Sequence, residues 1–186
     1  TVRVDEYFWL RERENPAVAF ANSNYLVVWN DERDNNNDLY AARVAPAGVV
    51  LDPGGFPVCA LGDAAENPDV AGSGMNWLAV WEDDRVGSDD IYAARVTPDG
   101  TVLDPGSIRI TFDTQNMMEK AAAGYNGTDW LVAWEDGRNG GPREVYAARL
   151  TGSGVLLDTG GILLCRDSTG GYLPDVASDG TNWIVV

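Results

Sequence analysis

The sequence predicts an all-β fold, a β-propeller of four-stranded antiparallel blades of about 52–53 residues, with about 3.5 blades in the 186-residue chain. Three observations predict it. The sequence repeats at a fixed period, each repeat contains one strand that is apolar on both faces, and glycine or asparagine recurs at fixed turn positions. A stacked β-solenoid is disfavoured because its strands would repeat at shorter periods and pair in parallel.

The repeat consists of three sequence blocks that recur in the same order. The segment Tyr25–Trp29 returns at residues 77–81, 130–134 and 183–186, whose first residues are separated by 52, 53 and 53 positions. The other two blocks occupy residues 39–44, 91–96 and 145–150, and residues 50–54, 102–106 and 156–160. We therefore divide the chain into residues 1–15, the outer strand of a preceding blade, three blades at 16–67, 68–120 and 121–173, and residues 174–186, the first two strands of a further blade.

The first and second strands of each unit have different compositions. The first strand is built of small residues, as in Pro68–Ala71, which suits a place where several sheets converge. In the second strand, Trp77, Ala79 and Trp81 point to one side of the sheet and the residues between them to the other. Both sets are apolar, so we expect this strand to be buried between two neighbouring sheets.

The third and fourth strands complete the unit. The third strand carries the Tyr-Ala-Ala-Arg block, and prolines such as Pro57 mark the fourth as an edge strand. Turn columns of asparagine or glycine separate the strands, at Asn22, Gly74, Gly127 and Gly180 and at Gly48, Gly100 and Gly154. We assign a structural role to the repeated aromatic and arginine side chains Trp29, Trp81, Trp134, Tyr40, Tyr92, Tyr146, Arg43, Arg95 and Arg149.

Composition and charge exclude several classes of function. With 29 acidic and 13 basic residues, the formal net charge is −16, which disfavours nucleic acid as a partner. The chain has no histidine, so catalytic triads with an imidazole base and histidine-ligated metals are excluded. No apolar run approaches the length of a membrane-spanning helix, so we expect no membrane insertion. Cys59 and Cys165 lie in blades separated by another blade, which predicts two free thiols.

Two polar patterns are candidates for a site. The recurring pairs of Asp31 with Arg33, Asp83 with Arg85, and Asp136 with Arg138 could bind carboxylates, sugars or a peptide. Because they recur in every blade, we favour a structural role for them. Asp34, Asn36 and Asp38 alternate as calcium ligands do, but without the glutamate of an EF-hand, so we expect no cofactor and keep calcium as a weak alternative.

A single active site on a repeating ring must break the repeat. The positions that break it are Phe20, Asn36, Phe112, Met117, Met118, Glu119 and Arg143. They form no recognisable acid–base set, and no pair stands out among the 29 carboxylates. We therefore expect a protein that is not an enzyme.

The blocks Trp81–Arg85, Asp90–Tyr92 and Pro98–Gly100 resemble the repeats of bacterial secreted β-propeller proteins and, more distantly, TolB-like propeller repeats. The resemblance covers essentially the whole chain and implies a propeller fold and export from a bacterial cell. It implies little about function, because such propellers serve as binding platforms, scaffolds and occasionally enzyme supports.

We accordingly predict a non-enzymatic binding or scaffold module of a bacterial extracellular or cell-surface protein. Two alternatives stay open: a carbohydrate-binding lectin with repeated sites, and a fragment of a propeller glycoside hydrolase or lyase. An open propeller has unpaired sheet edges, so we expect the ring to be completed by a second copy, as a homodimer, or by the rest of a longer chain. We also consider a protein or a carbohydrate as its ligand.

Overall fold

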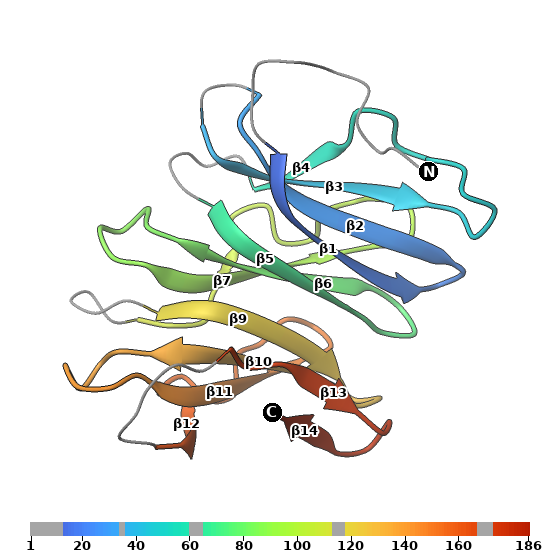
Figure 1. The fold of residues 1–186 in the computed structure, drawn as a ribbon. Coiled ribbons are helices and arrows are strands. Elements are labelled where there is room, and N and C mark those ends of the chain that lie inside the picture. Colours follow the sequence, from blue (N-terminus) through green and yellow to red (C-terminus); the bar gives the residue numbers. More distant parts are fainter. Residues whose placement is uncertain (1–12, 34–35, 60–64, 113–117, 167–172) are drawn as a thin grey trace.

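The computed structural model describes residues 13–33, 36–59, 65–112, 118–166 and 173–186. Three four-stranded antiparallel sheets and one two-stranded sheet follow one another, and in each sheet the strands pair in chain order. Figure 1 shows the sheets side by side, from the blue N-terminal sheet to the red C-terminal hairpin. The predicted all-β propeller architecture is confirmed.

The strands of the first and second sheets have the following bounds. The first sheet contains β1 (Arg13–Ala21), β2 (Asn24–Asp31), β3 (Asp38–Val44) and β4 (Phe56–Cys59). The second sheet contains β5 (Ala65–Gly72), β6 (Trp77–Asp83), β7 (Asp90–Val96) and β8 (Ile108–Arg109).

The third sheet and the hairpin complete the structure. The third sheet contains β9 (Met118–Tyr125), β10 (Asp129–Asp136), β11 (Glu144–Thr151) and β12 (Ile162–Cys165). The final hairpin consists of β13 (Val176–Ser178) and β14 (Trp183–Val185).

The innermost strands β1, β5 and β9 begin earlier than the small-residue segments from which we predicted them. Each contains a residue with positive φ near its start: Asn15 at 50°, Asn67 at 46° and Lys120 at 55°. The register of β1 with β2 and of β5 with β6 shifts at these points, as in a β-bulge. The bulge lengthens each strand past the prolines Pro16 and Pro68, where the sequence suggested a strand start.

Apart from Gly74, which does not have positive φ, the turn columns have the backbone conformation that the sequence predicts. Gly48, Gly100 and Gly154 have φ between 81° and 89°, and Asn22 has φ of 52°. These angles are accessible to glycine and asparagine at little cost, which explains why the columns hold these two residues.

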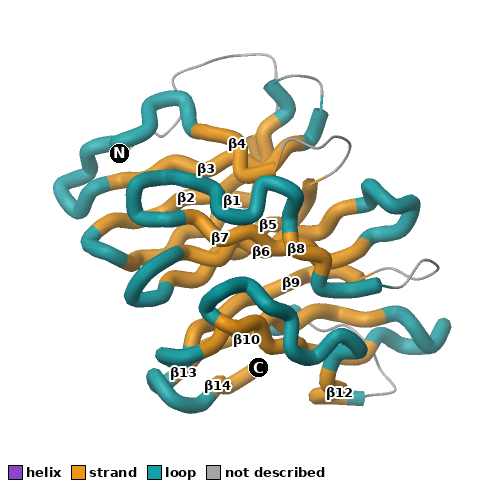
Figure 2. The backbone as a smooth tube through the Cα atoms, turned by 180° about the vertical axis from the view of Figure 1, so that it is seen from behind, coloured by secondary structure: helices purple, strands orange, loops and turns teal. Residues whose placement is uncertain are grey.

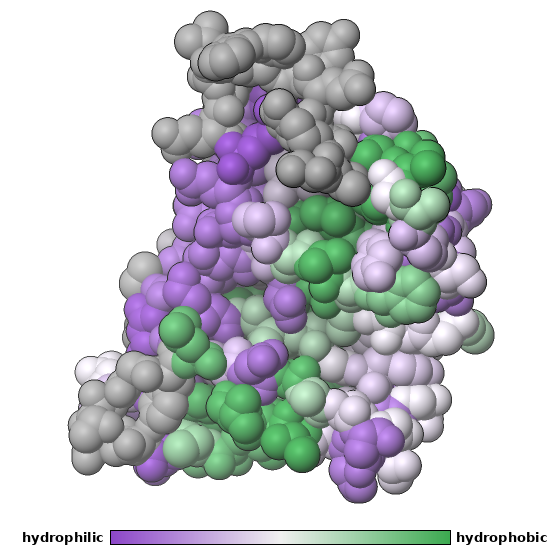
Figure 3. Space-filling model, turned by 45° about the vertical axis from the view of Figure 1, so that its right-hand side comes forward, coloured by the Kyte–Doolittle hydropathy of each residue, from purple (hydrophilic) through white to green (hydrophobic). Residues whose placement is uncertain are grey.

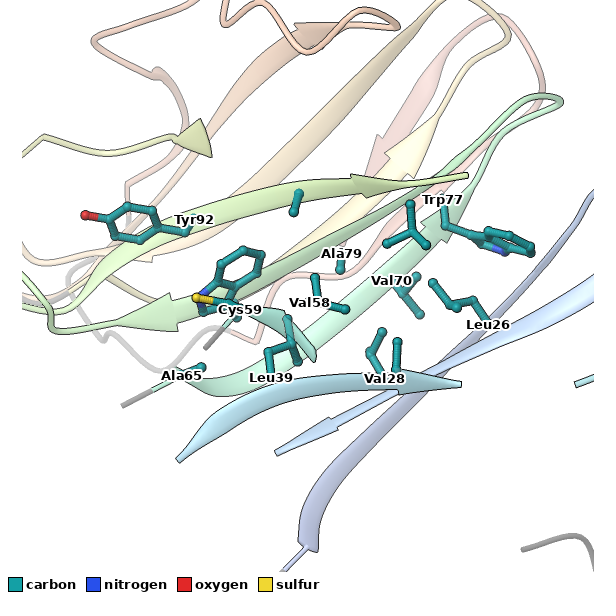
Figure 4. Close-up of a cluster of buried hydrophobic side chains, with 14 of the residues drawn as sticks. Leu26, Val28, Leu39, Val58, Cys59, Ala65, Val70, Trp77, Ala79 and Tyr92 are labelled. Atoms are coloured by element: carbon teal, nitrogen blue, oxygen red, sulfur yellow. The ribbon is translucent and has the colours of Figure 1, made fainter. Parts of the chain in front are cut away.

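Apolar side chains from neighbouring sheets form the core. Between the first and second sheets, Leu26 and Val28 of β2 face Trp77 and Ala79 of β6 (Figure 4). Between the second and third sheets, Leu78 and Val80 of β6 pack in one cluster with Trp130, Val132 and Trp134 of β10. Every residue of β6 is buried, as its two apolar faces predict. The strands β4, β8 and β12 form the edge of each four-stranded sheet opposite the innermost strand, and Figure 2 labels all three in the view from behind.

Arginines of the third strands join turns of their own sheet and of the next sheet. Arg43 donates to both oxygens of Asp52, at 2.8 and 2.7 Å, and its Nη1 donates to the carbonyl of Pro98 in the following sheet at 2.8 Å. Arg95 makes the same connection with Asp104 and the carbonyl of Gly152. Arg149 pairs with Asp158 in the third sheet. Within the described segments, no helix has the length and hydropathy that a membrane span requires.

Candidate functional site

The predicted Asp–Arg pairs lie at the ends of β2, β6 and β10. Asp31 accepts hydrogen bonds from Trp29 Nε1 at 2.8 Å and from Arg33 Nε at 2.9 Å. The Arg33 guanidinium lies 3.8 Å from the centre of the Tyr40 ring and donates to the carbonyl of Gly54. Asp83 with Trp81, Arg85 and Tyr92, and Asp136 with Trp134, Arg138 and Tyr146, repeat this arrangement.

Each of these pairs connects strands of one sheet. Asp31 is fully buried. Burial by itself raises the pKa of Asp31, but hydrogen bonds from Arg33, Trp29 and Arg13 outweigh this effect and hold the pKa well below the usual range. A ligand at these positions would have to displace buried, charge-assisted hydrogen bonds. The ligand-binding role of these pairs therefore stays a prediction.

The sequence also contains a second set of ion pairs that we did not predict. Arg43, Arg95 and Arg149 pair with aspartates that follow them by nine residues in the chain. The sequence did contain a signal for these pairs. Asp52 and its counterparts belong to the repeated block at residues 50–54, which follows the Tyr-Ala-Ala-Arg block at a constant distance.

The calcium alternative finds no supporting geometry. Asn36 is exposed and Asp38 is buried at the start of β3, while Asp34 lies outside the described residues. Among the residues that the structure describes, no cluster of three or more aspartate, glutamate or cysteine side chains could hold a metal ion.

The innermost strands surround a pocket of about 260 Å³. Its lining consists of the bulge residues and their neighbours: Asn15, Pro16, Asn67, Pro68, Lys120, Ala121, Leu173 and Pro174. The first strands of the three four-stranded sheets and the segment that precedes β13 contribute to this axial pocket, and Lys120 is its charged side chain. Asparagine occupies the matching position in the first two sheets, so the axial pocket is not symmetric.

A group of charged side chains lies next to Lys120, between the second and third sheets. Arg143 Nη2 donates to Glu119 Oε1 at 2.7 Å, and Arg143 Nη1 contacts Glu119 and, at 3.1 Å, Glu135. Glu82 accepts a hydrogen bond from the Lys120 backbone N–H at 2.7 Å. Asp89 joins the group through its backbone carbonyl, which accepts from the Met118 N–H at 2.9 Å, one residue before Glu119. We call Glu82, Asp89, Glu119, Glu135 and Arg143 the carboxylate cluster.

The environment shifts the pKa values of these carboxyl groups in opposite directions. The hydrogen bond from Arg143 lowers the pKa of Glu119 below its usual range. Burial raises the pKa of Asp89, and the negative charges of Asp84 and Glu119 raise it further. Burial likewise raises the pKa of Glu82. The cluster thus contains one carboxylate held ionised and two carboxyl groups that retain a proton to higher pH, which is a typical arrangement for acid–base chemistry.

The cluster forms where the repeat is broken. At the position of Asp89 the first sheet has Asn37 and the third has Arg143, and Asn30 stands at the position of Glu82. We marked Arg143 and Glu119 as deviant and did not predict their approach to Asp89. Arg143 does break the repeat, but the deviant assignment of Glu119 was wrong, because Glu14 and Glu66 stand at the same position in the first two sheets. Met117, another deviant position, lies outside the described residues.

The cluster lies at the hydrophilic side of the molecule. The β6–β7 connection that carries Asp89 and the β10–β11 connection that carries Arg143 extend to the left in Figure 1. In Figure 3, hydrophilic residues gather along this left-hand side. A polar face that carries one asymmetric cluster has the character of a binding site for a polar substrate.

Comparisons with known proteins relate this fold to enzymes. No protein-family model matches the chain, and no curated protein matches it. Among solved structures, an α-L-arabinofuranosidase from Lactobacillus brevis matches 93% of this chain with a TM-score of 0.58 and 13% identity. A thermostable family-43 glycoside hydrolase matches with a TM-score of 0.54 and 13% identity, and the GH43 endo-arabinanase from Bacillus licheniformis with 0.54 and 14%. The matches cover 91% and 89% of this chain.

The chain spans less than two thirds of each of these proteins, with 64%, 63% and 64% of their lengths covered. At such low identity the likeness shows the propeller fold. Because the similar structures are glycoside hydrolases, the comparisons contradict our predictions of a non-enzymatic binding or scaffold module and of a protein that is not an enzyme. They favour the alternative of a propeller glycoside hydrolase fragment, and they give no support to TolB-like repeats.

Proposed function

We propose that this chain is part of a propeller glycoside hydrolase, and that Asp89 and Glu119 are its catalytic carboxyl groups. The observation that carries the proposal is the opposite shift of their pKa values at a place where the repeat is broken. The enzymatic names of the structural neighbours support the same reaction class. Hydrolysis of a glycosidic bond requires one carboxyl group that holds a proton and a second that is ionised.

In the proposed reaction, the Asp89 carboxyl group donates its proton to the glycosidic oxygen as the bond from that oxygen to the anomeric carbon breaks. The Glu119 carboxylate removes a proton from the water molecule whose oxygen forms the new bond to the anomeric carbon. Arg143 keeps Glu119 ionised and in place. Lys120 borders the axial pocket, where part of a polysaccharide chain would lie.

The names of two structural neighbours support a proposal for the substrate class. One of them is an arabinofuranosidase and another is an endo-arabinanase, so we propose an arabinose-containing polysaccharide as substrate. Such polymers are found outside cells, which agrees with our expectation of a bacterial secreted or cell-surface protein. That localisation stays a prediction.

Further sheets are proposed to complete the ring. Ile162, Leu163 and Leu164 of β12 and Phe20 of β1 have exposed fractions of 41–56%, which is unusual for apolar side chains of propeller strands. A second copy of the chain, or sheets from a longer chain, would bury them. The molecular mass of the 186-residue protein in solution distinguishes these alternatives, because completion by a second copy predicts a dimer.

The test is hydrolysis of 4-nitrophenyl α-L-arabinofuranoside and of arabinan. We expect Asp89→Asn and Glu119→Gln each to lower kcat/KM by about 10²–10⁴-fold, the range typical of general acid–base groups. Glu66→Gln is the matched control, because Glu66 occupies the position of Glu119 in the preceding sheet and is exposed. We expect it to retain activity. Activity should also fall as the pH rises through the pKa of Asp89, because the proton donor is then lost.

Two results would overturn the proposal. One is a wild-type protein that hydrolyses neither substrate. The other is an equal loss of activity in Glu66→Gln and Glu119→Gln, which would show that this column of glutamates only supports the fold.

A further inference from the structure

A second pocket, of about 290 Å³, opens between the second and third sheets. Ile110 and Phe112 after β8 form one wall, and Met118, Trp134 and Arg138 form another, with the turn at Gly160 closing one side. It shares no lining residue with the axial pocket. We call it the intersheet pocket.

The corresponding space between the first and second sheets is filled. There the Cys59 sulfur accepts a hydrogen bond from Arg85 Nη2 at 3.0 Å and lies 3.8 Å from Ser107 Oγ. Cys59 is buried (Figure 4). The arginine at the end of the second strand therefore meets a side chain from the preceding sheet.

Two differences in sequence leave the space between the second and third sheets open. Thr111 stands where the first sheet has Cys59, and its hydroxyl turns into its own sheet. It donates to Asp90 Oδ1 at 2.6 Å and accepts from the Ile91 N–H at 2.9 Å. Gly161 stands where the second sheet has Ser107, so the third sheet offers no side chain there. The pocket is thus a consequence of departures from the repeat, as the carboxylate cluster is.

The lining determines which ligand fits. The Arg138 charge is matched by Asp136, which accepts from its Nε at 2.8 Å and its Nη2 at 2.5 Å, so the pocket offers no unbalanced charge. Phe112 is 56% exposed, and the Arg109 guanidinium lies 5.2 Å from the centre of its ring. Polar and apolar groups share the lining about equally, with the apolar part supplied by Ile110, Phe112, Met118 and Trp134. This combination suits a neutral ring with an apolar face and a few hydroxyl groups, and the volume suits a single ring.

We propose that the intersheet pocket binds one neutral sugar ring, as a binding subsite separate from the catalytic carboxyl groups. The neutral and amphipathic character of the ligand follows from the lining. The choice of a sugar rests on the proposed function. In a polysaccharide-degrading enzyme, such a subsite would hold a side branch or a distant unit of the polymer.

The test is titration of the Glu119→Gln protein with L-arabinose and with D-xylose, followed by the NMR signals of the Trp134 indole and the Thr111 backbone amide. A single ring of this size is expected to bind with a Kd of about millimolar. Phe112→Ala should weaken binding by about tenfold or more, because it removes one apolar wall. Phe20→Ala is the matched control, since Phe20 is also 56% exposed but lies on β1. It should bind as before.

D-Galacturonate provides a charged comparison and should bind more weakly than the neutral sugars. The inference is overturned if neither neutral sugar shifts these signals, if Phe20→Ala weakens binding as much as Phe112→Ala, or if the uronate binds more tightly. Sugar binding without any hydrolysis by the wild-type protein would contradict the proposed function and leave this inference standing.

Discussion

The interface between the first and second sheets and the interface between the second and third sheets are built from the same repeat but differ at one end. Their inner parts are alike, with a tryptophan pair from the central strand buried in each. At the polar end, the first interface holds Asn30 and the Cys59–Arg85 contact. The second holds the carboxylate cluster and the intersheet pocket. The shared features thus stabilise the fold, and the differences mark where chemistry is to be sought.

The largest effect that this comparison predicts concerns two equivalent tryptophans. Trp81 packs in the filled first interface, whereas Trp134 borders the intersheet pocket. Both substitutions to alanine leave a cavity, but Trp134 already borders open space in the intersheet pocket, so its removal costs less packing. We expect Trp81→Ala to lower the free energy of unfolding by about 5 kcal/mol and Trp134→Ala by about 3 kcal/mol. Urea denaturation of both variants measures the difference, and an equal or reversed order would show that the two interfaces are packed alike.

A smaller and pH-dependent effect is expected for Glu82, which stands where the first interface has Asn30. Burial raises the pKa of Glu82 above its ordinary value of 4.5. The unfolded chain therefore loses this proton at lower pH than the folded chain does. As the pH rises from the pKa of the unfolded chain to that of the folded chain, Glu82 destabilises the fold increasingly. Glu82→Gln should raise the free energy of unfolding at pH 7 and leave it unchanged at pH 3, where the glutamate is protonated in both states.

Denaturation at both pH values checks this expectation. Glu66→Gln, an exposed substitution in the preceding sheet, is the control and should change stability at neither pH. A Glu82→Gln protein that is less stable at pH 7 would mean that the charged carboxylate is a net stabilising partner of Lys120.

Much of the fold follows from the sequence, because its features are local and repeated. The period, the doubly apolar strand around Trp81 and the glycine turns at Gly48 and Gly100 each have a direct structural cause. The bulges were not predictable in the same way. Lys120 adopts positive φ although lysine has no preference for it, because pairing with β10 and the contact of its N–H with Glu82 fix the backbone there.

The candidate site was predictable only in part. Arg143 could be marked as deviant because a repeat reveals its own exceptions, whereas Glu119 shares its column with Glu14 and Glu66 and differs from them in its partner Arg143. The approach of Arg143 and Glu119 to Asp89 depends on how the second sheet packs against the third, since these residues lie 24 to 54 positions apart in the chain. The sequence pattern also drew attention to the Asp–Arg pairs around Asp31, whose strict repetition indicates a structural connection in each sheet. The repeats predict the architecture. The contacts among residues that depart from the repeat depend on how the sheets pack in three dimensions, and the sequence alone does not show them.

The most direct test of the central claim is an NMR titration of the Asp89 and Glu119 side-chain carboxyl groups. The account predicts that Asp89 titrates above its ordinary pKa of 3.8, because of burial and the charges of Asp84 and Glu119. Glu119 should titrate below its ordinary pKa of 4.5, because of Arg143, and Arg143→Gln should raise it. An Asp89 that titrates at or below 3.8, or a Glu119 that titrates at or above 4.5, would contradict the assignment of an acid and an ionised partner to this interface.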